Sequence, residues 1–213
     1  MSYLVLIGDL VASRQSTDRK GLQNRLEALL KLLNERASKP LSPYTLTLGD
    51  EFQVVFNRAD RVFVDMVQIM EALHPDRVRF SLGLGNIATE LNPYQAVGMD
   101  GPAFYRARDG INRLKESGEL FHLDGLAENC APLAEGTLRL LSQRFKKWEA
   151  NRLAILHGLL VGNSVKAIAK NLSVSEQAVY KNIRSGGLEA VIQVLSALAE
   201  LLNNCLAEDG STD

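Results

Sequence analysis

The chain has 213 residues, of which 46% are hydrophobic and 23% are charged. This composition excludes a disordered chain and is ordinary for a globular protein with one core and a smaller second domain. The formal charge of −1 gives the whole chain no nucleic-acid signature, so charge has to be counted by region.

The two cysteines, Cys130 and Cys205, lie far apart and form no CxxC motif. No basic and apolar secretory leader precedes the first apolar run, so we expect reduced thiols and a cytoplasmic location. No apolar run reaches the roughly 18 to 20 residues of a membrane span, because Glu189, Gln193 and Glu200 interrupt the C-terminal segment. We expect no membrane partner.

The first element is a nearly continuous apolar run from Tyr3 to Val11, as expected for a central strand covered on both faces. Asp9 lies near its end, where an isolated carboxylate is costly unless cations or a metal ion neutralise it. Leucines at 22, 26, 29, 30 and 33 then recur at helical spacing and predict an amphipathic helix that ends before Pro40.

Thr45 to Phe56 consists of two apolar-rich runs that meet at Gly49 and Asp50, with Glu51 directly after them. This pattern predicts a β-hairpin. Gly-Asp is a common turn pair and a strand-end acid can cap the next element, so turn chemistry explains these acids as well as a metal site does. Carboxylates from adjacent strands can also supply the oxygen ligands that Mg²⁺ prefers.

A second helix is expected over 62–73, opened by Asp60 or Asn57, and an alternating strand is expected over 78–87. The order β-α-β-β-α-β predicts an α+β fold of the ferredoxin-like type, with two helices on one face of an antiparallel sheet. In that topology the first and third strands are central neighbours. We therefore expect Asp9 and Asp50 to meet.

Three segments carry a resemblance to known proteins: IGDLV at 7–11, LGDEF at 48–52 and GMDGPAF at 98–104. They are similar to the metal-binding strand, the Gly-Asp hairpin and a later Gly-Pro helix start of class III nucleotidyl cyclases and the related GGDEF diguanylate cyclases. This similarity covers roughly the first 125 residues. Over nearly its full length the chain resembles the SatD family.

The cyclase resemblance implies a site for Mg²⁺ or Mn²⁺ and for a nucleotide. By resemblance, the metal ligands are Asp9, Asp50 and Glu51, and the nucleotide-binding residues are Gly8, Gly49, Arg106 and Arg108. The next motif departs from the family, because Tyr105 and Asp109 stand where the cyclases carry an Asn and an Arg. Nucleotide binding is thus better supported than catalysis, and a solvated helix face is the alternative for the two arginines.

A last strand is expected over 119–123, after which the composition changes and Pro132 precedes a new helical run. We place the domain boundary there, with a cyclase-like domain over 1–130 and an all-α domain over 131–213. The three histidines, His74, His122 and His157, are scattered and predict no metal site.

Residues 164–184 resemble a helix-turn-helix of the kind in transcription regulators and in the fourth region of sigma factors. Ala169 is small where two helices would cross, and Ser175 is placed to cap the second helix. The core between the helices is expected to consist of Ile168, Leu172, Val174, Val179 and Ile183.

The exposed face of the second helix is then suited to base edges and phosphates in a major groove. From Arg144 to Arg184 eight basic residues stand against two acidic ones, a net charge of +6, while the rest of the chain has 16 basic and 23 acidic residues. A helix-turn-helix used only as a structural bundle is the alternative. The expected DNA contacts are Ser175, Gln177, Tyr180, Lys181 and Arg184.

After Gly186 and Gly187 the final helix is apolar on more than one face, with Leu188, Leu195 and Leu202 along one of them. We expect a homodimer through this helix, and packing back onto the N-terminal domain is the alternative. The sequence thus predicts a DNA-binding transcription regulator with a nucleotide- or metal-binding sensor domain. The competing hypothesis is an active Mg²⁺-dependent nucleotidyl cyclase or nucleotidyltransferase whose helical domain only dimerises.

Overall fold

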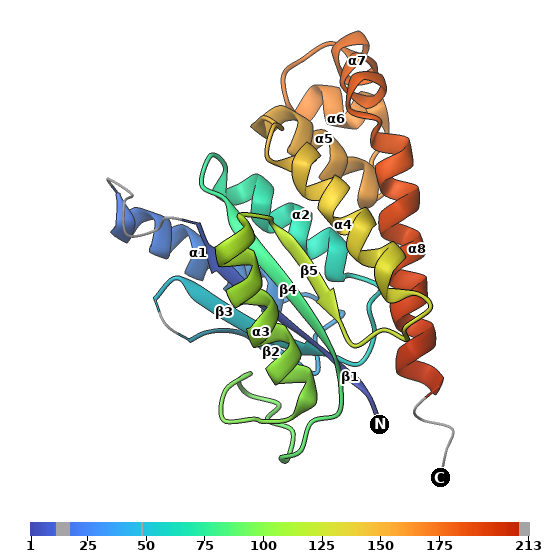
Figure 1. The fold of residues 1–213 in the computed structure, drawn as a ribbon. Helices are drawn as coiled ribbons and strands as arrows, with labels where there is room; N and C mark the ends of the chain where they lie inside the picture. The colour runs from blue at the N-terminus through green and yellow to red at the C-terminus, as the bar shows by residue number, and fades with distance from the viewer. Residues whose placement is uncertain (12–17, 48, 209–213) are drawn as a thin grey trace.

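The computed structural model describes residues 1–11, 18–47 and 49–208 (Figure 1). Its strands are β1 (Tyr3–Leu10), β2 (Ser42–Leu46), β3 (Glu51–Phe56), β4 (Val78–Gly85) and β5 (Phe121–Asp124). Its helices are α1 (Arg19–Asn34), α2 (Val62–Leu73), α3 (Pro102–Ser117), α4 (Ala131–Phe145), α5 (Ala150–Leu160), α6 (Val165–Asn171), α7 (Glu176–Gly186) and α8 (Leu188–Glu208).

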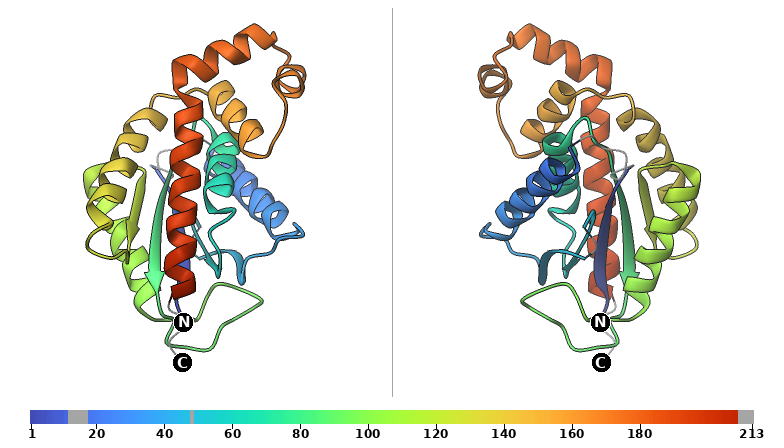
Figure 2. Two further views of the ribbon diagram at one scale, coloured as in Figure 1. Left: turned by 90° about the vertical axis from the view of Figure 1, so that its right-hand side faces the viewer. Right: turned by 90° about the vertical axis from the view of Figure 1, so that its left-hand side faces the viewer.

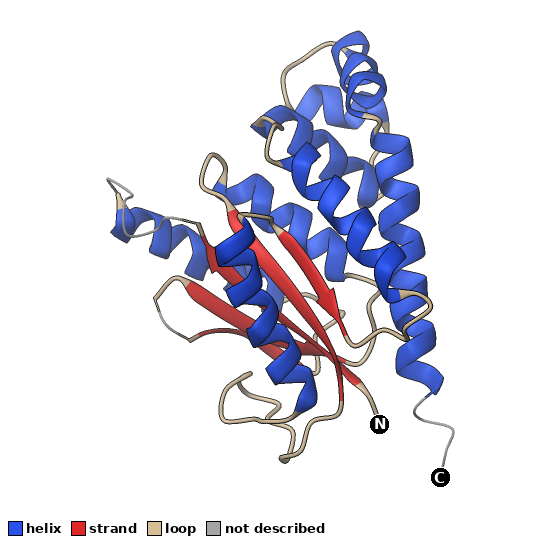
Figure 3. Ribbon diagram, viewed as in Figure 1, coloured by secondary structure: helices blue, strands red, loops and turns tan. Residues whose placement is uncertain are grey.

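The strands form one mixed sheet in the order β2-β3-β1-β4-β5. β1 is central and runs antiparallel to both β3 and β4, while β5 is added parallel to β4. The first four strands therefore have the ferredoxin-like arrangement expected from the β-α-β-β-α-β order, with the first and third strands adjacent. The mixed α+β class is confirmed (Figure 3).

Alternation along β1 divides its side chains between two cores. Leu4, Leu6 and Leu10 contribute to a large apolar cluster with residues of α1 and α2, whereas Val5 and Ile7 contribute to a second cluster with α3. α1 and α2 thus cover one face of the sheet, and α3 covers the other.

α3 lies unusually close to the sheet because glycines remove the side chains between them. A Cβ atom on Gly83 of β4 would overlap the backbone of α3 at Ala103. A Cβ atom on Gly110 of α3 would overlap the side chains of Ser81 and His122. The glycine in the fourth strand therefore marks a close approach of backbone.

Some predicted boundaries shift. α2 begins after Arg61 and has no side-chain cap, so neither Asp60 nor Asn57 caps it. The Asp60 carboxylate instead accepts a hydrogen bond of 2.6 Å from Asn203 of α8 and pairs with Arg58. β4 ends at Gly85, two residues before the expected end of that strand.

A row of aromatic rings crosses the sheet on the face of α1 and α2 and continues into the helical part. Neighbouring ring centroids are 4.4 to 6.3 Å apart along the row. Such contacts add to the burial energy of large side chains. The row contains Tyr44, Phe52, Phe80, Phe121, Phe145 and Trp148.

The same hydrophobic cluster extends through α4 to α8, so it continues across the boundary predicted at residue 130. α4 packs on β5, and α5 packs on α2. α6 and α7 lie at one end of the molecule, beyond the sheet, and α8 runs back from them along the helices (Figure 2). The division into 1–130 and 131–213 stays a prediction.

α8 packs back onto its own chain. Leu188, Leu195 and Leu202, the face expected at a dimer interface, are 0%, 5% and 0% exposed. Asn203 anchors the helix by accepting a hydrogen bond of 2.8 Å from the backbone N–H of Ala59. The face of α8 on which the dimer argument depended is therefore already buried within one chain, and the homodimer itself stays a prediction.

One helix among the described residues, α8, has the length and composition of a membrane span, with a mean hydropathy of 1.5 over residues 188–207. The expectation that Glu189, Gln193 and Glu200 rule out such a segment was therefore wrong. Leu188, Leu195 and Leu202 lie on a buried face, and 28% of the residues in the apolar window are buried. One face of α8 thus belongs to the core, while most of its residues are exposed or half-buried.

Candidate functional site

Charged residues gather on the α3 side of the sheet, at the end of β1 where Asp9 lies. Asp9 is directly opposite Glu51 of β3 on one side and Arg79 of β4 on the other. The two acids are 6% and 5% exposed. Buried carboxylates need partners, because loss of hydration costs far more than a surface ion pair returns.

Basic groups satisfy Asp9 on both oxygens. Arg79 Nη1 donates to Oδ2 at 3.1 Å, and Lys115 Nζ of α3 lies 3.0 Å from Oδ1. Lys115 is in the last turn of α3. The pairing therefore ties the C-terminal end of α3 to the central strand of the sheet.

Glu51 is held in the same way. Arg108 Nη1 donates to Glu51 Oε1 at 2.5 Å, and Thr47 Oγ1 donates to the same oxygen at 3.0 Å. Arg108 and Lys115 are two turns apart on α3 and so face the sheet together. The cluster of Asp9, Glu51, Arg79, Arg108 and Lys115 is hereafter the acid–base cluster.

Asp50 and the two glycines have local roles. The backbone carbonyl of Asp50 accepts a 3.0 Å hydrogen bond from the N–H of Leu10, so the hairpin does lie beside the end of β1. It is Glu51, however, that is the cross-strand partner of Asp9. Gly49 has φ +60°, a turn conformation that favours glycine, and a Cβ on Gly8 would overlap the ring of Phe52.

Arg106 is not in the cluster. Its Nη1 donates at 2.5 Å to the carbonyl of Leu84, which pairs with Leu4 at the opposite end of β1. Of the two arginines expected to bind a nucleotide, the fold brings only Arg108 to the acids.

The acids as they lie do not fit a divalent cation, because both oxygens of Asp9 are ion-paired with protein groups. Within residues 1–11, 18–47 and 49–208 no group of three or more His, Cys, Asp or Glu side chains is placed to hold a metal ion. A cation ligated by Asp9 would first have to displace Lys115 or Arg79. We derive no chemistry through a metal.

Arg79, Lys115 and Thr47 were not identified from the sequence. Two signals were available: an arginine inside an otherwise apolar alternating strand, and a basic residue seven positions after Arg108 on the same helix. Neither identifies a partner until the register of the sheet and the position of α3 are known.

A second candidate site lies on α6 and α7, which are joined by residues 172–175. Ser175 caps α7 by accepting a 3.1 Å hydrogen bond from the N–H of Ala178, as expected. Ser173, in the turn, has φ +55°, a conformation that glycine adopts more easily. The residues buried between α6, α7 and their neighbours are Ile168, Ala169, Val179 and Ile183, and Leu172 and Val174 are half-buried.

The five residues predicted to contact DNA are all exposed. Tyr180 is 49% exposed, although tyrosines are usually better buried. Within the described part of the chain, none of the ion pairs uses Lys166, Lys170, Lys181 or Arg184. The basic side chains of α6 and α7 are thus available to a partner, unlike those of the acid–base cluster.

The fold and these two sites describe an α+β protein with a ferredoxin-like sheet, a closed acid–base cluster and C-terminal helices, of which α6 and α7 carry exposed basic side chains. The chain belongs to the SatD family, whose model matches residues 3–202.

Comparison with solved structures finds class III nucleotidyl cyclases. A bacterial light-regulated adenylyl cyclase aligns with 60% of this chain at 14% identity and a TM-score of 0.42, and this chain spans 46% of that protein. The catalytic core of a rhodopsin-guanylyl cyclase with converted specificity, in complex with ATPαS, aligns with 51% of this chain and 70% of that one at 20% identity and a TM-score of 0.35. No curated protein matches the chain. Because both TM-scores are below 0.5 and both identities are 20% or lower, these similarities assign no activity to this chain.

Proposed function

We propose that this protein is a cytoplasmic DNA-binding regulator that contacts duplex DNA through α6 and α7, with α7 in the major groove. The observation that supports this most directly is the exposed face of α7. Gln177, Lys181 and Arg184 are solvent-exposed there, while Val179 and Ile183 on the opposite side are buried. The same helix thus has one side for packing and one for a polar partner.

The chemistry of that face fits a nucleic acid. Lys181 and Arg184 supply cations for phosphates, and Gln177 in the first turn has an amide that can pair with a base edge. Lys166 and Lys170 on α6 are exposed and extend the basic surface. Phosphate contacts of this kind provide most of the affinity, and the amide contributes sequence preference.

The competing cyclase function is less favoured by the geometry. Both oxygens of Asp9 are ion-paired, and Arg106 lies at the other end of β1 from the acids. Incubation with each NTP and Mg²⁺ or Mn²⁺ tests it directly. Formation of a cyclic nucleotide or pyrophosphate would make the cyclase activity the better-supported function.

Fluorescence anisotropy with a labelled random duplex tests the DNA proposal. We expect binding at about 50 mM salt that weakens as salt rises. Lys181→Ala with Arg184→Ala should lower the slope of log K against log salt by about one unit for each phosphate that is no longer bound. Lys31→Ala, at an exposed lysine of α1, is the matched control and should leave the slope unchanged. Wild-type protein that is folded and binds no duplex refutes the proposal.

A further inference from the structure

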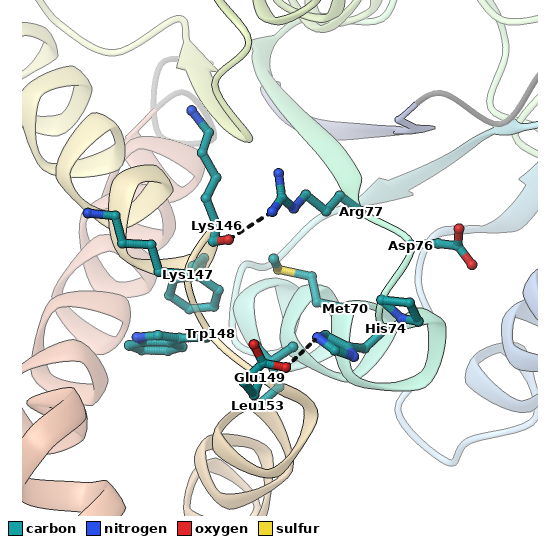
Figure 4. A pocket seen from close by; sticks show the side chains of 11 residues that line it. Met70, His74, Asp76, Arg77, Lys146, Lys147, Trp148, Glu149 and Leu153 are labelled. Atoms are coloured by element: carbon teal, nitrogen blue, oxygen red, sulfur yellow. Dashed lines mark hydrogen bonds and ion pairs between the residues drawn. The ribbon is translucent and has the colours of Figure 1, made fainter. Parts of the chain in front are cut away.

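A cavity of about 210 Å³ lies between the turn from α2 to β4 and the connection from α4 to α5 (Figure 4). Its apolar lining includes Met70, Phe145, Trp148 and Leu153. The rings of Phe145 and Trp148 end the aromatic row that crosses the sheet, with centroids 4.4 Å apart. One wall is therefore built from closely packed apolar side chains, which are common in pockets that hold small molecules.

Opposite charges face this cavity from its two sides. Arg77, directly before β4, is exposed and donates one hydrogen bond, from Nη2 to the carbonyl of Lys146 at 3.0 Å. Glu149 is the N-cap residue of α5, but its side chain makes no capping hydrogen bond. Its carboxylate is 88% exposed and lies 3.8 Å from His74 Nε2.

Two other charged groups around the cavity, Asp76 and Lys146, form ion pairs with residues outside it. Asp76 forms an ion pair with Arg25 at 3.1 Å and is directed away from the cavity in Figure 4. Lys146 pairs with Glu119 at 3.1 Å, and its ammonium also points away from Met70. Arg77 makes no ion pair among the described residues, and Glu149 has one long contact, with His74 at 3.8 Å, so these two groups offer a cation and an anion to a ligand, with Lys147 exposed beside them.

We propose that this cavity binds a free α-amino acid with an apolar side chain. A zwitterion matches a guanidinium on one side and a carboxylate on the other, because the ligand carboxylate pairs with Arg77 and its ammonium with Glu149. The apolar side chain packs against Met70, Leu153 and the aromatic wall. A cavity of 210 Å³ is below the roughly 300 to 1,000 Å³ of drug-sized pockets, which also favours a ligand of this size.

Trp148 is the only tryptophan in the chain and lines the cavity, so its fluorescence, excited at wavelengths selective for tryptophan, reports on the site. L-leucine, L-methionine and L-phenylalanine are titrated to millimolar concentrations while Trp148 emission and the melting temperature are followed. At least one should change the emission in a saturable way and raise the melting temperature. Isocaproate, which lacks the ammonium of leucine, and isoamylamine, which lacks its carboxylate, should bind at least about tenfold more weakly.

Arg77→Met and Glu149→Gln should each weaken binding by at least about tenfold, since each removes one charge-assisted contact. Both residues are exposed, so neither change should unfold the protein. Arg139→Met, at an exposed arginine of α4 outside the cavity, is the matched control. The proposal is overturned if no amino acid alters either signal, if isocaproate and isoamylamine bind as well as leucine, or if both variants bind like wild type.

Discussion

Lys115 Nζ lies 3.0 Å from Asp9 Oδ1, on the side of the central strand that α3 covers. The resemblance to class III cyclases places a divalent cation on the same carboxylate. In this protein an ammonium and the guanidinium of Arg79 take up both oxygens of Asp9. The acid that the sequence identifies as a metal ligand thus serves to fasten α3 to the sheet.

Lys115→Met should expose a latent cation site. The substitution keeps most of the aliphatic side chain but removes its charge, which leaves Asp9 beside Glu51 with one basic partner fewer. We expect wild-type protein to show no rise in melting temperature with Mg²⁺ or Mn²⁺, and the variant to show one. A cation at several times its dissociation constant stabilises the folded state by on the order of 1 kcal/mol, which differential scanning fluorimetry detects.

Lys31→Met, on the exposed surface of α1, is the control for loss of a lysine as such. The prediction is contradicted if Mg²⁺ already raises the melting temperature of the wild-type protein and does not raise that of Asp9→Asn. The metal ion would then displace Lys115 from Asp9. The metal site predicted from the sequence would then be correct.

Asp65 of α2 makes stability depend on pH in the direction opposite to most acids. It is 4% exposed, and burial raises the pKa of its carboxyl, although Arg36 and Tyr44 act to lower it. The folded state therefore holds the proton more tightly than the unfolded state. The free energy of unfolding should fall as pH rises from about 3.9 through the raised pKa, and Asp65→Asn should abolish this fall.

Asp60→Asn is the control with the opposite sign. The hydrogen bond from Arg58 lowers the pKa of Asp60. The contribution of Asp60 to the free energy of unfolding is therefore present above the usual pKa of an aspartate and is lost as pH falls through the lowered value. Urea unfolding at several pH values between about 3 and 7 measures both. An Asp65→Asn profile that keeps the wild-type slope would show that Asp65 does not titrate in this window.

The sequence was sufficient for the α+β class and for the order of the first four strands because these signals are local. The alternating strands, the leucines of α1 and the Gly-Asp turn each determine an element from neighbouring residues, and the ferredoxin-like topology results from their order. The placement of α8 is different. A helix that is apolar on several faces packs equally well on a second copy or on its own chain, and only the position of α2 and α5 decides between them.

The site was harder to predict because its partners are distant in the chain. Asp9 and Lys115 are brought together only when α3 packs closely on the sheet, as it does at Gly83 and Gly110. The acids could be identified from the sequence as a pair, but the cations that neutralise them could not. The chemistry assigned to the pair changes once those cations are known.

Gly110 and Gly136, both within helices, should respond oppositely to replacement by alanine. A Cβ on Gly110 would overlap Ser81 and His122, so Gly110→Ala should push α3 from the sheet and cost about 1 to 3 kcal/mol. A Cβ on Gly136 of α4 meets nothing within 4 Å, so Gly136→Ala should stabilise by about 0.5 to 1 kcal/mol. Urea denaturation compares the two. Equal effects would mean that α3 does not pack closely on β4.

Leu202→Ala tests whether α8 belongs to the core of one chain or to a dimer interface. Leu202 is fully buried, and truncation of such a leucine costs about 2 to 5 kcal/mol because it loses burial and leaves a cavity. Leu140→Ala is the matched control, since Leu140 of α4 is 71% exposed, and it should change stability by less than about 0.5 kcal/mol. Light scattering should give the same mass for wild type and Leu202→Ala, because the packing that the substitution removes lies within one chain. A wild-type dimer that Leu202→Ala converts into an equally stable monomer would instead place Leu202 between two copies.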